Sequence, residues 1–188
     1  MRLAHLLVAL GVSRSPAAAD NPALRFADIL WGDPVAVAKE KLKSNGYVVE
    51  GMQGNDLTFR GRFHGYDGRG MIYLADGRVV RTFFSIEPPP AQALVTFDRI
   101  RKDLLRQLGP ATFNVEHYNA PYVKGDGREV EALQQGQLRV ALAWQAGKNP
   151  DEGGCFVEMG KDLTLFVVYE GPKWHAERLR RKKAKEGS

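Results

Sequence analysis

The chain has 188 residues, a formal net charge of +5 and a single cysteine, so no intrachain disulfide is possible. Seven of its 27 lysine and arginine residues but only two of its 22 acidic residues lie at positions 173–188, and the rest of the chain is therefore neutral. The basic character belongs to a C-terminal tail. We expect no nucleic-acid partner, because the sequence has no basic strip with interleaved aromatic residues and no recognisable nucleic-acid module.

Residues 1–19 have the pattern of a secretory signal peptide. Arg2 precedes a short apolar run at 3–12, and an A-x-A cleavage site ends at Ala19. We therefore expect a periplasmic or secreted protein that begins at Asp20 after cleavage. The alternative is a disordered extension of a cytoplasmic protein, whereas a membrane anchor would need about 20 apolar residues.

After the signal, the sequence predicts a single α+β domain at 20–172, built from two half-repeats at about 26–87 and 92–170, and the basic tail at 173–188. The first half-repeat opens with a helix from about Pro34 to Asn45. Asp33 has the residue type of an N-cap, and Gly46 is a typical stop. Strands are then expected near 47–51, 57–63, 71–75 and 79–86. The last of these is apolar on both faces and is expected to be central.

The second half-repeat follows a proline-rich linker at 87–91. Its helix is expected over 93–108, where apolar residues recur at helical spacing and Gly109-Pro110 ends the pattern. Strands are expected near 113–118, 128–133, 138–145, 155–159 and 163–169. A helix followed by antiparallel strands, twice, predicts an antiparallel sheet with the helices on one face.

Three Asp-Gly-Arg sequences, starting at Asp67, Asp76 and Asp126, are interpreted as turns, because Asp-Gly supplies the positive φ that tight turns need. The four histidines are scattered without metal-ligand spacing, and no phosphate-binding glycine motif is present. We expect no catalytic, metal or cofactor site that the sequence can name. Cys155 is expected to be buried, although pairing between chains is the alternative.

The candidate binding residues are aromatic side chains in or beside loops, with one neighbouring lysine: Tyr118, Tyr122, Lys124 and Trp174. Tyrosine and tryptophan suit binding surfaces because they combine apolar area with a polar group. The alternative is that they pack their loops onto the core. The basic tail would either attract anionic surfaces or form a solvated, frayed C-terminal helix. Trp174 and Leu179 would hold the start of the tail on the body or on a lipid interface.

The spacing of several landmarks resembles that of small, uncharacterised exported bacterial proteins. These landmarks are Trp31-Gly32, Gly46-Tyr47, Gly61-Arg62-Phe63, the hairpin at 74–79, Leu108-Gly109-Pro110, Trp144 and Tyr169. Their repeats look like the fold of the beta-lactamase inhibitor protein and of the small outer-membrane assembly lipoproteins. This chain lacks the lipidation cysteine of the lipoproteins and the disulfides of the inhibitor. The resemblance therefore implies a fold and transfers no functional residue.

Together these features favour an exported, non-enzymatic binding module whose sheet face or long loops dock a protein or cell-envelope component. The alternative is a hydrolase of an envelope polymer that uses carboxylates from separate strands, such as Asp151, Glu152 or Glu158. The sequence indicates neither the ligand nor the oligomeric state.

Overall fold

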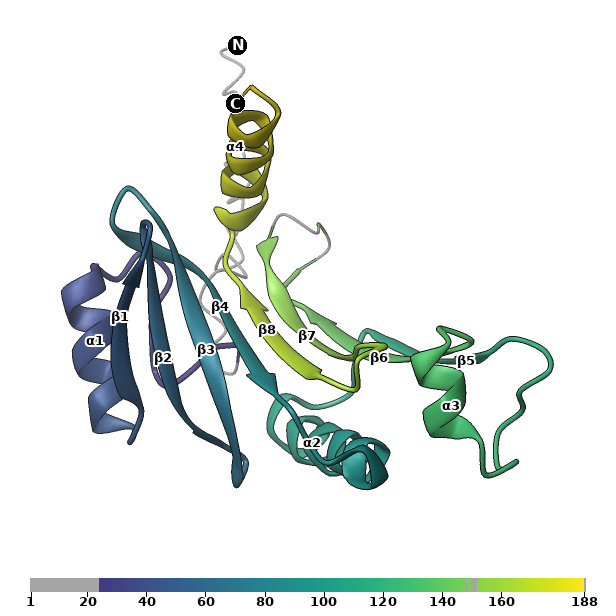
Figure 1. The fold of residues 1–188 in the computed structure, drawn as a ribbon. Helices are drawn as coiled ribbons and strands as arrows, with labels where there is room; N and C mark the ends of the chain where they lie inside the picture. Colours follow the sequence, from purple (N-terminus) through teal and green to yellow (C-terminus); the bar gives the residue numbers. More distant parts are fainter. Residues whose placement is uncertain (1–23, 148, 150–151, 188) are drawn as a thin grey trace, which may run out of the picture.

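The computed structural model describes residues 24–147, 149 and 152–187, so the predicted signal peptide at 1–19 lies outside the described residues. Within them, one eight-stranded antiparallel sheet is accompanied by four α-helices, which confirms the predicted α+β class (Figure 1). No helix in these ranges is long and apolar enough to cross a membrane.

The strands have the spatial order β1-β2-β3-β4-β8-β7-β6-β5. Their bounds are β1 Val48–Gln53, β2 Asp56–Phe63, β3 Tyr66–Ala75, β4 Arg78–Ile86, β5 Phe113–Tyr118, β6 Leu138–Gln145, β7 Gly154–Met159 and β8 Leu165–Glu170. The helices are α1 Val35–Ser44, α2 Ala93–Leu108, α3 Glu129–Gln134 and α4 Trp174–Glu186, and a short 3-10 turn, η2 Pro90–Gln92, precedes α2.

The chain order is α1 and then β1–β4, followed by α2 and then β5–β8, with α3 inserted after β5. The last strand of each group, β4 and β8, pair with one another in the middle of the sheet. The predicted central position of the 79–86 strand is therefore confirmed. The predicted bounds of α2, β5 and β6 agree with the structure.

One hydrophobic core lies against the sheet, and alternate residues of the strands point into it. It includes Ala38 and Leu42 of α1, and Ile100 and Leu104 of α2. We call this side of the sheet the core face. Five aromatic rings gather there beneath α1: Phe26, Tyr47, Phe59, Phe63 and Phe84.

Two glycines of β3 make room for this aromatic cluster. A Cβ atom added at Gly70 would overlap with the ring of Phe59. At Gly68 it would overlap with the backbone oxygen of Ser85 in β4 and with the Phe84 ring. Both positions therefore require glycine because the rings and the neighbouring backbone approach closely.

This packing corrects one of the three Asp-Gly-Arg interpretations. Asp67-Gly68-Arg69 lies inside β3, where Gly68 serves close packing, and does not form a turn. The interpretation of Asp76-Gly77 is confirmed, since it joins β3 to β4 with positive φ at both residues. At Asp126-Gly127, Gly127 has the expected positive φ of 77°, but the loop leads into α3 and not into a strand.

The predicted strand at 128–133 is wrong, because Glu129–Gln134 forms α3. Just before the helix, the Asp126 carboxylate accepts a hydrogen bond from the Arg128 N–H at 2.8 Å. Glu, Ala, Leu and Gln favour helices, and two acidic residues in the first turn complement the helix dipole. Ala132 and Leu133 form the buried side of this short helix.

The predicted N-cap of α1 is also wrong. Pro34 occupies the cap position, and no side chain caps the helix. The Asp33 carboxylate instead accepts hydrogen bonds from the Leu30 N–H and from Lys41, both at 2.8 Å. It therefore ties the segment before α1 to the last turn of the helix.

Replacing Gly68 with alanine should destabilise the fold by about 1–3 kcal/mol, because the added methyl group would push β3 away from β4 and Phe84. Urea denaturation measures this change. Asp67→Ala is the matched control, because Asp67 is the exposed neighbour and should change the free energy of unfolding by less than about 0.5 kcal/mol. Equal stability of Gly68→Ala and wild type would contradict the packing role.

Candidate functional site

The structure does not bring the four candidate binding residues together in one site. Tyr122 is only 4% exposed and belongs to the core, and its hydroxyl lies 2.7 Å from Glu131 Oε1 and 2.8 Å from Gln135 Oε1. Tyr122 therefore holds its loop against α3. This placement agrees with the alternative that the loop aromatics pack their loops onto the core.

Tyr118 and Lys124 lie together in a groove of about 250 Å³ between α2 and β5. Tyr118 is half-buried against the core, and the Lys124 Nζ is 2.9 Å from Glu116 Oε1. The other charges of this groove are paired too, since Arg101 contacts Asp98 at 3.2 Å. Hydrogen bonding from Lys102 lowers the pKa of Asp98. The charged side chains that line this groove are therefore paired with one another.

A larger candidate site lies on the sheet face that points away from the core, here called the open face. Six apolar side chains are cross-strand neighbours on it, one from each of six consecutive strands. This apolar row consists of Met71, Phe83, Val168, Phe156, Ala143 and Phe113. Phe166, Ala141 and Val115 of the adjacent register positions extend it over β8, β6 and β5.

The apolar row is partly open to solvent. Phe113 is 54% exposed and Phe156 is 37% exposed, while Met71, Phe83 and Ala143 are half-buried. The wet face of an antiparallel sheet normally carries polar side chains. A contiguous apolar patch in such a place is typical of an interaction surface.

Two recesses border the apolar row at its β3–β4 end. One, of about 390 Å³, is lined by Met71, Phe83 and Tyr73 together with polar residues of β1 and β2. The other, of about 450 Å³, lies among Arg60, Arg69 and Glu87. The open face is therefore hollowed on both sides of this end of the apolar row.

Trp174, the fourth candidate residue, begins α4 and packs on the open face one register row beyond the apolar row. Its ring lies 5.2 Å from that of Tyr73, and the Arg81 guanidinium lies over both rings at 4.7 and 4.9 Å. Arg81 also pairs with Glu170 at 3.2 Å, and burial raises the pKa of Glu170. Trp174 is 7% exposed, so it anchors the start of the tail on the body, which is one of the alternatives that the sequence left open. Leu179 is exposed and does not contribute to this anchor.

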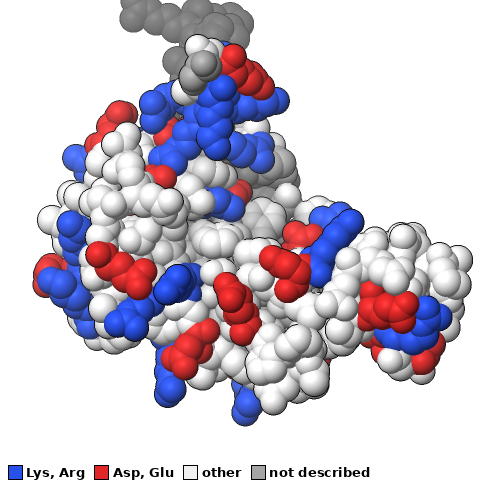
Figure 2. Space-filling view, viewed as in Figure 1, with Lys and Arg blue, Asp and Glu red and all other residues white. Residues whose placement is uncertain are grey.

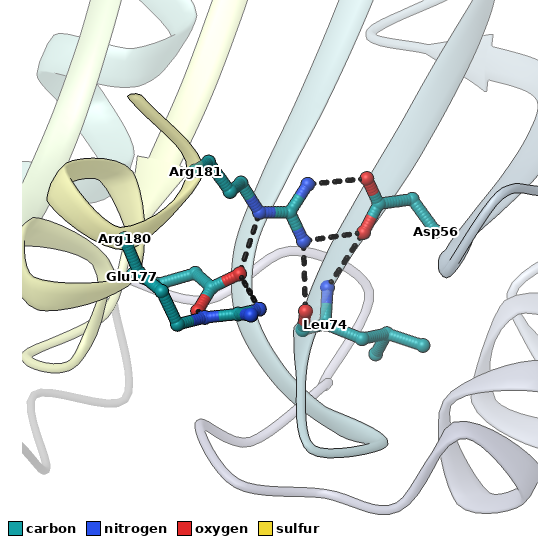
Figure 3. A network of polar contacts seen from close by, with 5 residues as sticks. All are labelled: Asp56, Leu74, Glu177, Arg180 and Arg181. Carbon is teal, nitrogen blue, oxygen red and sulfur yellow. Dashed lines mark hydrogen bonds and ion pairs between the residues drawn. The ribbon is translucent and has the colours of Figure 1, made fainter. Parts of the chain in front are cut away.

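A second anchor of α4 is a polar network that we call the Arg181 clamp (Figure 3). Arg181 donates to both Asp56 oxygens at 2.6 and 2.8 Å, to the Leu74 carbonyl at 2.8 Å and to Glu177 at 2.6 Å. Asp56 also accepts from the Leu74 N–H at 3.0 Å. Arg180 completes the network with two hydrogen bonds to Glu177.

The electrostatics of the clamp follow from these contacts. Hydrogen bonds from Arg180 and then Arg181 lower the pKa of the buried Glu177 carboxyl. The hydrogen bond to Asp56 raises the pKa of Arg181. A bidentate arginine–carboxylate pair is geometrically specific, so the clamp fixes the direction of α4 as well as its position. An entirely solvated, frayed tail does not fit this arrangement.

Between α4 and the β1–β2 turn lies a groove of about 700 Å³ that we call the α4 groove. Its basic side belongs to α4, and Figure 2 shows the lysine and arginine side chains that gather there. Gln53 and Tyr73 line both this groove and the recess beside the apolar row. The α4 groove and the apolar row are therefore neighbouring parts of one surface.

The remaining candidates from the sequence are the cysteine, the carboxylates of the alternative hydrolase and the metal-ligating residue types. Cys155 is buried, as predicted, and burial raises the pKa of its thiol. Glu158, named for the alternative hydrolase, pairs with Arg139 across the strands at 3.2 Å, and Asp151 lies outside the described residues. Within the described ranges, no three His, Cys, Asp or Glu residues form a group that would hold a metal ion.

Comparison with protein-family models, with curated proteins and with solved structures finds no match for this chain. The candidate site therefore rests on its own geometry. Sequence reasoning missed the apolar row and the clamp, because both depend on which strands become neighbours.

Replacing Arg181 with methionine should destabilise the protein by about 2 kcal/mol, because the buried Asp56 would lose its charged partner. Urea denaturation measures the loss, and limited proteolysis should show earlier cleavage within α4. Arg139→Met is the matched control. Arg139 also pairs with a glutamate, Glu158, but lies outside the clamp and both side chains are exposed, so its loss should cost less than about 0.5 kcal/mol. Similar losses for both variants would contradict the clamp.

The stabilising effect of Glu177 should depend on pH in a defined direction. Because its pKa is lowered in the folded state, its contribution is fully present above the ordinary glutamate pKa of about 4.3 and is lost as the pH falls through the lower folded value. The difference in free energy of unfolding between wild type and Glu177→Gln should therefore be constant above about pH 6 and shrink below about pH 4. A pH-independent difference would contradict this coupling.

Proposed function

We propose that this protein is an exported, non-enzymatic binding module that docks a protein or cell-envelope component on the open face of its sheet. The observation that carries the proposal is the apolar row across six consecutive strands. The proposed export depends on the signal-like sequence at 1–19.

The dimensions of the row suit a docking surface. Six strands at about 4.8 Å spacing give a row about 24 Å wide. A standard interface buries about 800 Å² on each partner and has an apolar centre with aromatic residues enriched. Phe83, Phe156 and Phe113 would provide such aromatic groups near the centre and at the β5 end of the row.

The sheet face is a better docking surface than the long loops. The Tyr122 ring is buried in the core and its hydroxyl forms a hydrogen bond with Glu131 of α3, while Lys124 is paired with Glu116. Phe156, by contrast, presents an exposed ring from a β-strand that is held on both sides by neighbouring strands. A rigid position lowers the entropy cost of binding.

Affinity capture with three baits tests the proposal. A partner captured from envelope or secreted fractions by the wild-type chain should be lost with Phe156→Asp, because a charge in the apolar row would have to be desolvated on binding. We expect at least a tenfold loss of affinity in a titration with the purified partner.

Val95→Asp is the matched control for capture. Val95 is 68% exposed on α2, away from the apolar row, and its replacement should leave binding unchanged. A partner that binds wild type and Phe156→Asp equally would place docking elsewhere. Both variants should keep the wild-type circular dichroism and thermal unfolding curve, which separates a binding defect from misfolding.

A further inference from the structure

We propose that α4 is a cationic arm that attaches the protein to an anionic lipid surface. This attachment goes beyond the proposed docking on the open face, because it uses different residues. Some basic groups of α4 are bound to acidic side chains of the protein, and others are presented to solvent.

Five of the six lysine and arginine residues of α4 fall into two groups, and the sixth, Arg178, contacts His175 at 3.3 Å. Arg180 and Arg181 are bound to Glu177 and Asp56, so they serve the clamp. Lys182, Lys183 and Lys185 are exposed beyond the clamp. The only ion pair that involves these three lysines in the described part of the chain joins Lys182 to Glu186, at 3.7 Å with both side chains exposed. The end of α4 therefore presents positive charge that is little compensated.

The clamp gives this charge a fixed direction. α4 has 13 residues, which corresponds to a length of about 20 Å. Figure 1 shows that it stands away from the sheet, with its first turn on the body and its last turn projecting. The chain before position 173 is neutral overall, so the positive field is concentrated on this arm.

An electrostatic contact fits α4 better than insertion into the membrane. Its few apolar residues do not form a continuous apolar side, because Leu179 is flanked by charged residues and Trp174 is buried on the body. Lysines near an anionic bilayer each contribute attraction that decays within a Debye length. The end of a single helix can reach a planar anionic surface, whereas a nucleic acid would require further phosphate contacts along the neutral body.

Vesicle co-sedimentation with the full chain tests the arm. The chain should bind phosphatidylglycerol vesicles, should not bind phosphatidylcholine vesicles, and should be released by about 0.5 M salt. Lys182→Gln/Lys183→Gln/Lys185→Gln should weaken binding to phosphatidylglycerol on the order of a hundredfold, since three attractive charges are removed.

The matched control is Lys43→Gln/Lys102→Gln/Lys161→Gln, which removes the same charge from exposed sites outside α4. It should bind within about threefold of wild type, because charges beyond a Debye length of the surface contribute little. Equal weakening of both triple variants would show that only net charge matters and would overturn the arm. Unchanged binding of the α4 variant, or tighter binding of a DNA duplex than of vesicles, would also overturn it.

Binding of vesicles by α4 and capture of a protein by the open face can be tested separately. Phe156→Asp should bind phosphatidylglycerol vesicles as wild type does, because it leaves α4 intact. If vesicle binding is lost in the α4 variant while protein capture persists, the arm and the open face act independently.

Discussion

The packing of aromatic rings against the glycines of β3 is the constraint on which the rest of the structure depends. Gly70 lies under Phe59, and Gly68 allows β4 and Phe84 to approach. Because side chains alternate between the two faces of a strand, this packing sets the register of β2, β3 and β4. Once Phe84 points into the core, its neighbour Phe83 must point to the open face.

The same alternation continues through the second half of the sheet. Val157 and Val167 enter the core, so Phe156 and Val168 face outward beside Phe83. The apolar row is therefore a consequence of strand order together with the choice of apolar residues on both faces. Burial explains why the residues of the core face are apolar. The open face is in contact with water, which gives no reason for apolar side chains there, whereas the proposed binding role would give one.

The Arg181 clamp connects the basic tail to this architecture. Asp56 opens β2, and its carboxylate binds both the Leu74 backbone of β3 and the guanidinium of α4. The tail therefore starts from a fixed point beside the open face. The proposed docking surface and the proposed cationic arm would together let one small domain hold a partner near an anionic surface.

Local features were predictable from the sequence and long-range features were not. The helix over 93–108 has strong apolar periodicity and a Gly-Pro end, and its bounds are confirmed. The strand expected at 128–133 failed because its apolar residues also fit one side of a short helix. Asp67-Gly68 was misread because glycine serves close packing as well as turns.

The candidate site was largely hidden for the same reason. The sequence presents Trp174 both as a candidate binding residue and as an anchor for the start of the tail, and it does not decide between them. The sequence places Phe83 and Phe156 on predicted strands. It does not indicate that these strands lie close together, because that depends on the order β4-β8-β7 in the sheet. Asp56 and Arg181 are far apart in sequence, and nothing in the local pattern of either residue indicates the other.

Site-specific photo-crosslinking in intact cells tests the central claim most directly. A benzophenone side chain placed at Phe156 would report what contacts the open face, and the same group at Val95 on α2 would report background. We predict a discrete adduct of one molecular mass at position 156 that is absent at position 95. Adducts of equal yield at both positions, or none at 156, would contradict docking on the open face.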